Sequence, residues 1–195
     1  LVASAVTFFL YCMQKFAVTP DVYWLLRGGQ YILSEGRLPA TDIFSWTFAD
    51  QPVLFYQWFF MVGMAAVEHI AGLQGVFFLF SVLAVGVYFL VPFLWAVPRK
   101  VPAFFVIVVS ALGMAVITVN LSLRPMIITS ALLLAQYMVV QQLRQDRLGI
   151  PAALASTAVI YVLWANTHNG IVLGFGHGGF VARQAQGGEI GAQVV

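Results

Sequence analysis

Long apolar runs, separated by short polar breaks, fill most of this chain. Each clear run approaches the roughly 20 residues that a helix needs to cross a bilayer, and the last run is short and rich in glycine. The pattern therefore predicts an all-α integral membrane protein with about six transmembrane helices. The runs cover residues 1–18, 73–97, 101–120, 126–143, 150–165 and 170–182.

A different pattern marks residues 19–58, which hold four of the seven acidic residues and three of the five tryptophans. Thr19 and Pro20 are typical of a helix start, and Gly36 is typical of a helix end. The spacing predicts a helix on the membrane surface with a polar, aromatic side facing outward, followed by an irregular loop over 37–52. The apolar face comprises Val22, Leu25, Leu26, Ile32 and Leu33, and the other face comprises Asp21, Trp24, Gly28, Tyr31 and Glu35.

The topology depends on residues 53–72. This run is long enough to cross, but one side carries a stripe of Gln57, Met61, Met64 and Glu68, and only Leu73-Gln74-Gly75 separates the run from the next, so the pattern leaves its placement open. Suppose first that it lies in the interface without crossing. Then Arg99-Lys100 and Arg144 share one side with Arg147, which the positive-inside rule makes cytoplasmic. The acidic loop and the polar segments 120–124 and 166–170 share the other side. If 53–72 crosses instead, the acidic loop joins the basic side and the two polar segments take the opposite face.

The charge bias favours the first arrangement. It predicts a polytopic membrane domain over 1–182, in which 19–72 form an extracytoplasmic loop with juxtamembrane helices, and a polar tail over 183–195. Because the chain begins at Leu1 without a methionine, we expect the numbering to start inside a longer product.

Composition narrows the class further. The chain is 62% hydrophobic and 8% charged, whereas a soluble domain has roughly 25% charged residues. A net charge of +2, with no basic cluster among aromatics, argues against nucleic acid as a partner. Cys12 is the only cysteine, which excludes an internal disulfide and a cysteine-based metal site.

Five short motifs stand out along the chain: DVYWLLRGG (21–29), RLPATDIFS (37–45), Gln57-Trp58, Leu123-Arg124-Pro125 and WANTHNG (164–170). Together they resemble the polytopic bacterial glycosyltransferases of the GT-C superfamily. The pattern is similar to the protein mannosyltransferases and lipid-A sugar transferases that use polyprenyl-phosphate sugars, and it extends from about residue 1 to about 180. The resemblance implies a GT-C-like helical bundle in the bacterial inner membrane with its active face extracytoplasmic.

Such an enzyme needs a base for the acceptor hydroxyl and stabilisation of the departing phosphate. On this resemblance Asp21 is the candidate base, and the alternative is a first-turn acid that complements the helix dipole. Asp42 is the second candidate, as acceptor positioner or as metal ligand with Asp21, and the alternative is a turn-capping aspartate. The sequence indicates no definite cofactor, and a divalent metal ion bound by Asp21 and Asp42 is the one candidate.

The remaining candidates would bind substrate. Arg124 begins an apolar run at the outer boundary and could hold the donor phosphate, or it could anchor to lipid headgroups. Asn166 and His168 could bind sugar hydroxyls or phosphate, or His168 could be solvated at the interface. Tryptophans could stack on sugar rings or form an interfacial belt. The full substrate-binding set is Trp24, Arg27, Trp46, Gln57, Trp58, Arg124, Asn166 and His168.

A second function remains open: a non-catalytic, GT-C-derived transmembrane subunit that packs against a larger complex. It is favoured by Leu25, Gln57 and Met126, which stand where the family commonly has His, Glu and Gln, and by the short chain. Glycines at 170, 174 and 178 would form a close helix-packing stripe. The expected partners are a lipid-linked sugar donor, membrane lipids and, in the second reading, other membrane protein subunits.

Overall fold

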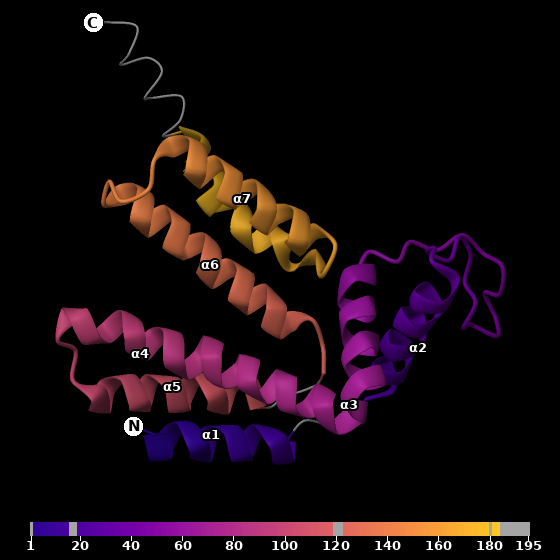
Figure 1. Ribbon diagram of the computed structural model, residues 1–195, viewed down its shortest axis with the longest axis horizontal. Helices are drawn as coiled ribbons and strands as arrows, with labels where there is room; N and C mark the ends of the chain where they lie inside the picture. The colour runs from indigo at the N-terminus through magenta and orange to yellow at the C-terminus, as the bar shows by residue number, and fades with distance from the viewer. Residues whose placement is uncertain (1, 16–18, 119–122, 180, 184–195) are drawn as a thin grey trace, which may run out of the picture. The chain divides into compact units, whose positions relative to one another are not determined.

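The computed structural model describes residues 2–15, 19–118, 123–179 and 181–183. These residues form helices joined by loops, and they contain one isolated bridge, between Thr41 and Pro52, but no strand. The all-α prediction is therefore confirmed. Two parts of the prediction lie outside the described residues: the polar tail after residue 183, and Asn120. The elements (Figure 1) are α1 Val2–Lys15, α2 Pro20–Glu35, α3 Trp58–Val85, η1 Gly86–Leu90, α4 Val91–Ala96, η2 Val97–Arg99, α5 Ala103–Thr118, α6 Met126–Arg144, α7 Ile150–Ala165 and η3 Asn169–Gly174.

Two described helical runs have the length and apolar composition to cross a membrane. They are Trp58–Arg99, which joins α3, η1, α4 and η2, and α6. The other apolar helices are shorter, since α1 has 14 residues and α5 and α7 have 16 each, against the roughly 20 that a crossing needs. A bundle of six crossings remains a prediction.

The chain divides into two compact units, Leu1–Ile127 and Ile128–Val195. In the first unit, α2 begins and ends as predicted. Thr19 is the extended N-cap and Pro20 opens the helix, while Gly36 ends it with φ 66 and donates its backbone N–H to the carbonyl of Ile32. A left-handed residue at this position favours glycine because it has no Cβ.

The buried face of α2 differs from the predicted one. Val22, Leu25 and Leu26 are buried as expected, but Leu33 is 50% exposed, and Gly28, expected on the outer face, is buried. Gly28 and its neighbour Gly29 face α3. The face of α2 that is buried therefore depends on two properties: hydrophobic side chains, and glycines that let the backbone of α3 come close.

The contact between α2 and α3 is close because glycine leaves room for it. A Cβ at Gly29 would lie 2.0 Å from the carbonyl oxygen of Met61, and a Cβ at Gly28 would lie 2.9 Å from the Met61 sulfur. Met61 and Met64, members of the stripe noted at 53–72, are buried, and Glu68 accepts a hydrogen bond from the Gln30 amide at 3.1 Å. The stripe is therefore the face of α3 that packs on α2.

Gly72 divides α3 into two helices. Its φ of 64 and ψ of −174 are non-helical, so the helical run changes direction there. The bend falls at the end of the predicted 53–72 segment. Beyond it, the run continues without a loop to Arg99, whereas the sequence suggested a break at residues 73–75.

The long run after Gly72 supports the other helices of the first unit. α1 contacts α3, and α5 contacts η1 and α4. Aromatic pairs join α1 to this run, with Phe8 and Phe89 ring centroids 5.6 Å apart and Phe9 and Phe78 centroids 5.5 Å apart.

In the second unit, α6 and α7 run in opposite directions, joined by a short loop (Figure 1). The chain then returns along α7 through η3 and the helical residues 175–179 and 181–183. Val140, Ala153 and Val181 form a buried cluster that joins all three segments.

The glycine stripe predicted at 170, 174 and 178 lies in this second unit, where it permits close packing within the chain. A Cβ at Gly174 would lie 2.6 Å from the Trp164 ring, and one at Gly178 would lie 2.7 Å from the Tyr161 hydroxyl. Gly174 and Gly178 therefore pack against α7 of the same chain, whereas a Cβ at Gly170 would lie 2.8 Å from the Thr129 side chain of α6.

Candidate functional site

Asp21 and Arg124, two predicted site residues that are 103 positions apart, form an ion pair. The Arg124 guanidinium donates through Nη2 to the Asp21 carboxylate. The Arg124 side chain is 50% exposed and the Asp21 side chain is 54% exposed, so solvent and a ligand can reach both. The candidate base and the candidate phosphate-binding group thus belong to one site.

Local structure explains how each partner is presented. Asp21 lies in the first turn of α2, where the unpaired backbone N–H groups favour a negative charge. Arg124 precedes α6 and is flanked by Leu123 and Pro125, both buried, so these two apolar residues hold the backbone while the guanidinium extends outward. Asp21 can complement the dipole of α2 and pair with Arg124 at the same time, because its carboxylate lies in the first turn of the helix and contacts the guanidinium.

The ion pair is weak enough to open. Exposed pairs contribute about 0–1 kcal/mol because water and salt screen them and side-chain entropy opposes them. A phosphate can offer a guanidinium two oxygen acceptors. Arg124 can therefore exchange the Asp21 carboxylate for a phosphate at small cost, which would release the carboxylate as a proton acceptor.

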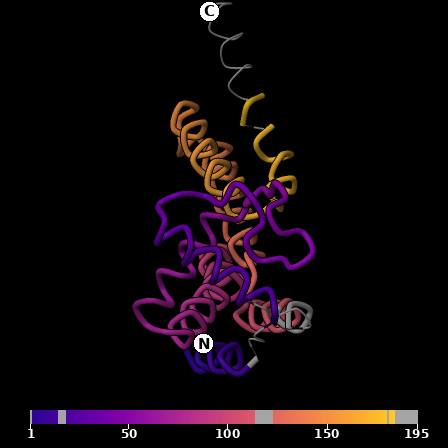
Figure 2. The backbone as a smooth tube through the Cα atoms, turned by 90° about the vertical axis from the view of Figure 1, so that its right-hand side faces the viewer, coloured from indigo at the N-terminus to yellow at the C-terminus, as the bar shows by residue number. Residues whose placement is uncertain are grey.

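An aromatic cluster holds the loop 37–57 on α2 (Figure 2, purple). Trp24 stacks on Phe55, with ring centroids 5.8 Å apart and planes 12° apart, and it meets the edge of Phe44 at 6.1 Å. Phe55 is buried. Because Trp24 follows Asp21 by one helical turn, this cluster fixes the loop close to the ion pair.

Asp42 caps a turn inside this loop. Its Oδ1 accepts hydrogen bonds from the backbone N–H groups of Phe44 and Ser45 at 2.8 and 2.9 Å. Its own backbone pairs with Gln51 and Asp50. The Ser45 hydroxyl, followed by these two backbone donors, lowers the pKa of Asp42 below its ordinary value. The geometry matches the turn-capping alternative, and no catalytic contact follows from it.

The other predicted residues of the first unit have varied settings. Arg27 donates to the Gln30 amide oxygen at 3.2 Å, and Gln30 in turn reaches Glu68 of α3, so Arg27 belongs to a polar link between the two helices. Gln57 is the N-cap residue of α3, and Trp58 is its first residue, with its ring edge-on to Phe59. Trp46 is 95% exposed at the tip of the loop.

His168 and Asn166 belong to the second unit. His168 Nδ1 accepts a hydrogen bond from the backbone N–H of Gly170 at 3.0 Å and lies 2.9 Å from the Thr129 hydroxyl. Since Gly170 can only donate, the proton of the neutral ring resides on Nε2. Burial lowers the pKa of His168 below its ordinary value. Asn166 caps α7 by donating to the carbonyl of Val162 at 2.8 Å.

Two members of this network were not predicted. Thr129 is 3% exposed in the first turns of α6, and Trp164 is fully buried in α7. The indole N–H of Trp164 donates to the Thr129 hydroxyl at 3.2 Å, which leaves that hydroxyl free to donate to His168. The signal in the sequence was a threonine within an apolar run, which is common and therefore weak.

A metal centre has little support in the residues present. Among the residues whose positions are described, no three His, Cys, Asp or Glu side chains gather closely enough to hold an ion. Asp21 is engaged by Arg124, and Asp42 by its turn. The reactive groups of this site are the Asp21 carboxylate and the Arg124 guanidinium beside it.

The chain matches no protein-family model, no curated protein and no solved structure. Membership of the GT-C superfamily therefore stays an expectation raised by the motifs.

Proposed function

We propose that this chain is an inverting membrane glycosyltransferase of the GT-C type, which moves a sugar from a polyprenyl-phosphate donor to an extracytoplasmic acceptor. The observation that carries the proposal is the ion pair between Asp21 and Arg124. Sugar transfer from a phosphate needs one acid–base group and one phosphate-binding cation at the same place, and the pair supplies both.

The reaction would use the two groups in separate roles. The acceptor hydroxyl attacks the anomeric carbon and forms the new C–O bond, while the bond from that carbon to the phosphate oxygen breaks and the polyprenyl phosphate leaves with the electron pair. Asp21 takes the proton of the hydroxyl. Arg124 donates hydrogen bonds to the departing phosphate, whose negative charge increases as the bond breaks.

The same proposal includes the membrane arrangement. The bend at Gly72 supports a juxtamembrane helix over residues 58–71 and a crossing from residue 73 onward. With α1, α5, α7 and the segment 170–182 also inserted, the chain makes about six crossings of the bacterial inner membrane, and Asp21 and Arg124 lie on the extracytoplasmic face.

The test is sugar release from a polyprenyl-phosphate donor by the Asp21→Asn variant. Asparagine keeps the size and most hydrogen bonding of the side chain but cannot accept the proton, so transfer should fall by about 100- to 10,000-fold. Asp50→Asn is the matched control, because Asp50 is exposed, outside the ion pair and in the left-handed conformation that asparagine tolerates. Full activity of Asp21→Asn would overturn the catalytic role.

The second candidate is a non-catalytic subunit of a larger membrane complex. Leu25 favours it: this residue stands where the resembled family has His, and it is 3% exposed in the contact between α2 and α3. A core leucine there provides packing and no proton transfer. Stable co-purification with other membrane proteins, together with an inactive wild type, would support this candidate.

A further inference from the structure

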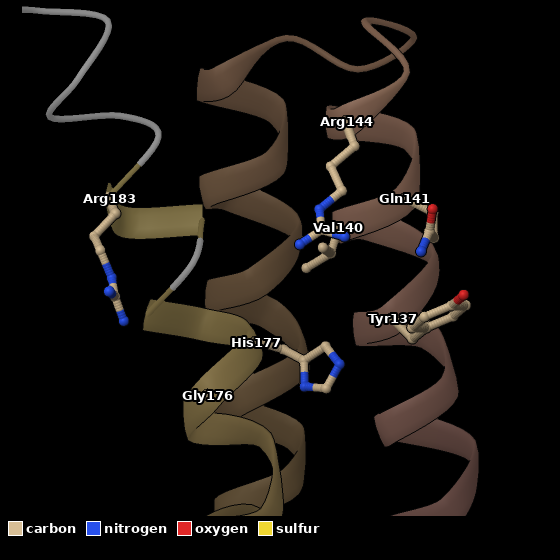
Figure 3. Close-up of a pocket in the computed structure, with 7 residues that line it drawn as sticks. All are labelled: Tyr137, Val140, Gln141, Arg144, Gly176, His177 and Arg183. Carbon is tan, nitrogen blue, oxygen red and sulfur yellow. The ribbon is translucent and has the colours of Figure 1, made fainter.

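The second unit contains an open pocket of about 580 Å³ that none of the predicted site residues lines (Figure 3). One wall is the C-terminal half of α6, with Tyr137, Val140, Gln141 and Arg144. The other wall is the helical segment after η3, with His177 and Arg183. The ring of His177 is turned toward Tyr137, with centroids 6.3 Å apart.

Basic side chains line both walls of the pocket. Each wall contributes one guanidinium, and no Asp or Glu is among the described residues that line it. A guanidinium offers several N–H donors in a planar fork that fits two phosphate oxygens. The amide of Gln141 and the hydroxyl of Tyr137 add polar groups that can orient an anion.

The size and position of the pocket indicate an organic phosphate. Its volume lies within the roughly 300–1,000 Å³ typical of small-molecule sites, which exceeds the space that one inorganic anion fills. The ring of Tyr137 and the side chain of Val140 give part of the wall an apolar surface. Arg144 is the last residue of α6, a helix long enough to cross a membrane, so in the membrane arrangement proposed above the pocket lies at the end of this crossing.

We propose that this pocket binds a phosphate group supplied by the headgroup of an anionic phospholipid. Basic pockets between transmembrane helices on the cytoplasmic side bind such headgroups, and the positive-inside rule puts the Arg144 end of α6 on that side. The lipid source rests on the membrane insertion proposed above. The anion site itself rests only on the residues of the pocket.

The test compares phosphatidylglycerol, phosphatidylcholine and inorganic phosphate as ligands of the full chain in an uncharged detergent. Binding is followed by native mass spectrometry and by the rise in melting temperature. Wild type should prefer phosphatidylglycerol, and Arg144→Gln and Arg183→Gln should each weaken that binding about 10- to 100-fold, as expected for a lost charge-assisted hydrogen bond. Arg147→Gln, an exposed arginine just beyond α6, should leave it unchanged.

The three ligands separate the outcomes. Phosphate binding that depends on both pocket arginines, without preference for phosphatidylglycerol, would support the anion site and overturn the lipid source. The measurement with inorganic phosphate tests the anion site even if the chain does not insert into membranes. Equal binding of the two lipids together with no effect of either pocket variant would overturn the proposal. Arg183→Lys, which keeps the charge, provides a folded comparison if the glutamine variant is unstable.

Discussion

The close contact of α2 with α3 predicts a steep effect of a single methyl group at Gly29. An alanine Cβ there would lie 2.0 Å from the Met61 carbonyl oxygen and 2.5 Å from its carbon. Because the obstacle is backbone, the two helices must move apart, and overpacking of this kind costs about 3 kcal/mol at the upper end of its usual range. Helix propensity returns about 1 kcal/mol, so Gly29→Ala should lose about 2 kcal/mol of unfolding free energy.

Two neighbouring glycines provide the controls. At Gly28 the obstacle is the Met61 sulfur at 2.9 Å, the flexible part of a side chain, so Gly28→Ala should be nearly neutral. At Gly63, in α3, an added Cβ meets nothing within 4 Å. Gly63→Ala should therefore gain the full helix propensity of about 1 kcal/mol.

The assay is reversible unfolding in mixed micelles, followed by circular dichroism. The expected order of unfolding free energy is Gly63→Ala above wild type, Gly28→Ala near wild type and Gly29→Ala well below it, with about 3 kcal/mol between the extremes. Equal stability of Gly29→Ala and Gly63→Ala would refute the close approach of α2 to Met61.

Three further predictions concern topology, packing and pH. The cysteine of the Thr47→Cys variant should react with an impermeant thiol reagent added outside the cytoplasm, and the cysteine of Gln145→Cys should not. Labelling of both variants from the same side would contradict the proposed topology. Gly174→Leu should destabilise the second unit, because its Cβ would meet the α7 indole at 2.6 Å, whereas Gly179→Leu, with nothing within 4 Å, should melt near wild type; equal melting temperatures would refute this packing. Because the folded pKa of His168 is below its unfolded value of 6.5, its contribution to stability is present above pH 6.5 and lost as the pH falls below it. Melting temperatures at pH 7.5 and 5.5 should differ more in wild type than in His168→Gln, and an equal difference would contradict the role of the ring.

Local signals in the sequence predicted most element boundaries. Thr19, Pro20 and Gly36 act through backbone groups close to them in the chain, and therefore the ends of α2 were predictable. A break after residue 72 was also expected, but at Leu73-Gln74-Gly75, whereas the structure bends at Gly72 and continues without a loop. The burial of Gly28 was not expected, because a residue without a side chain carries no hydrophobic signal, and only the structure shows that it faces Met61.

Long-range contacts were the part that sequence could not supply. Asp21 and Arg124 were each selected for their charge, but no local pattern indicated that they pair. The contact of Thr129 with His168 depends on how α6 and the end of α7 pack, as the pocket at Arg144 depends on the returning C-terminal segment. Such contacts arise from tertiary packing, which the period of one helix does not specify.

The central claim is that Arg124 binds the donor phosphate beside Asp21. The most direct measurement is the initial rate of sugar release from a polyprenyl-phosphate donor by purified wild type and by Arg124→Gln, under conditions where both have the same helicity. We expect an active wild type and a loss of about 100- to 1,000-fold in the variant, the usual effect of removing a group that stabilises developing negative charge. Equal rates would contradict the role of Arg124, and an inactive wild type would contradict the enzyme and favour the non-catalytic subunit.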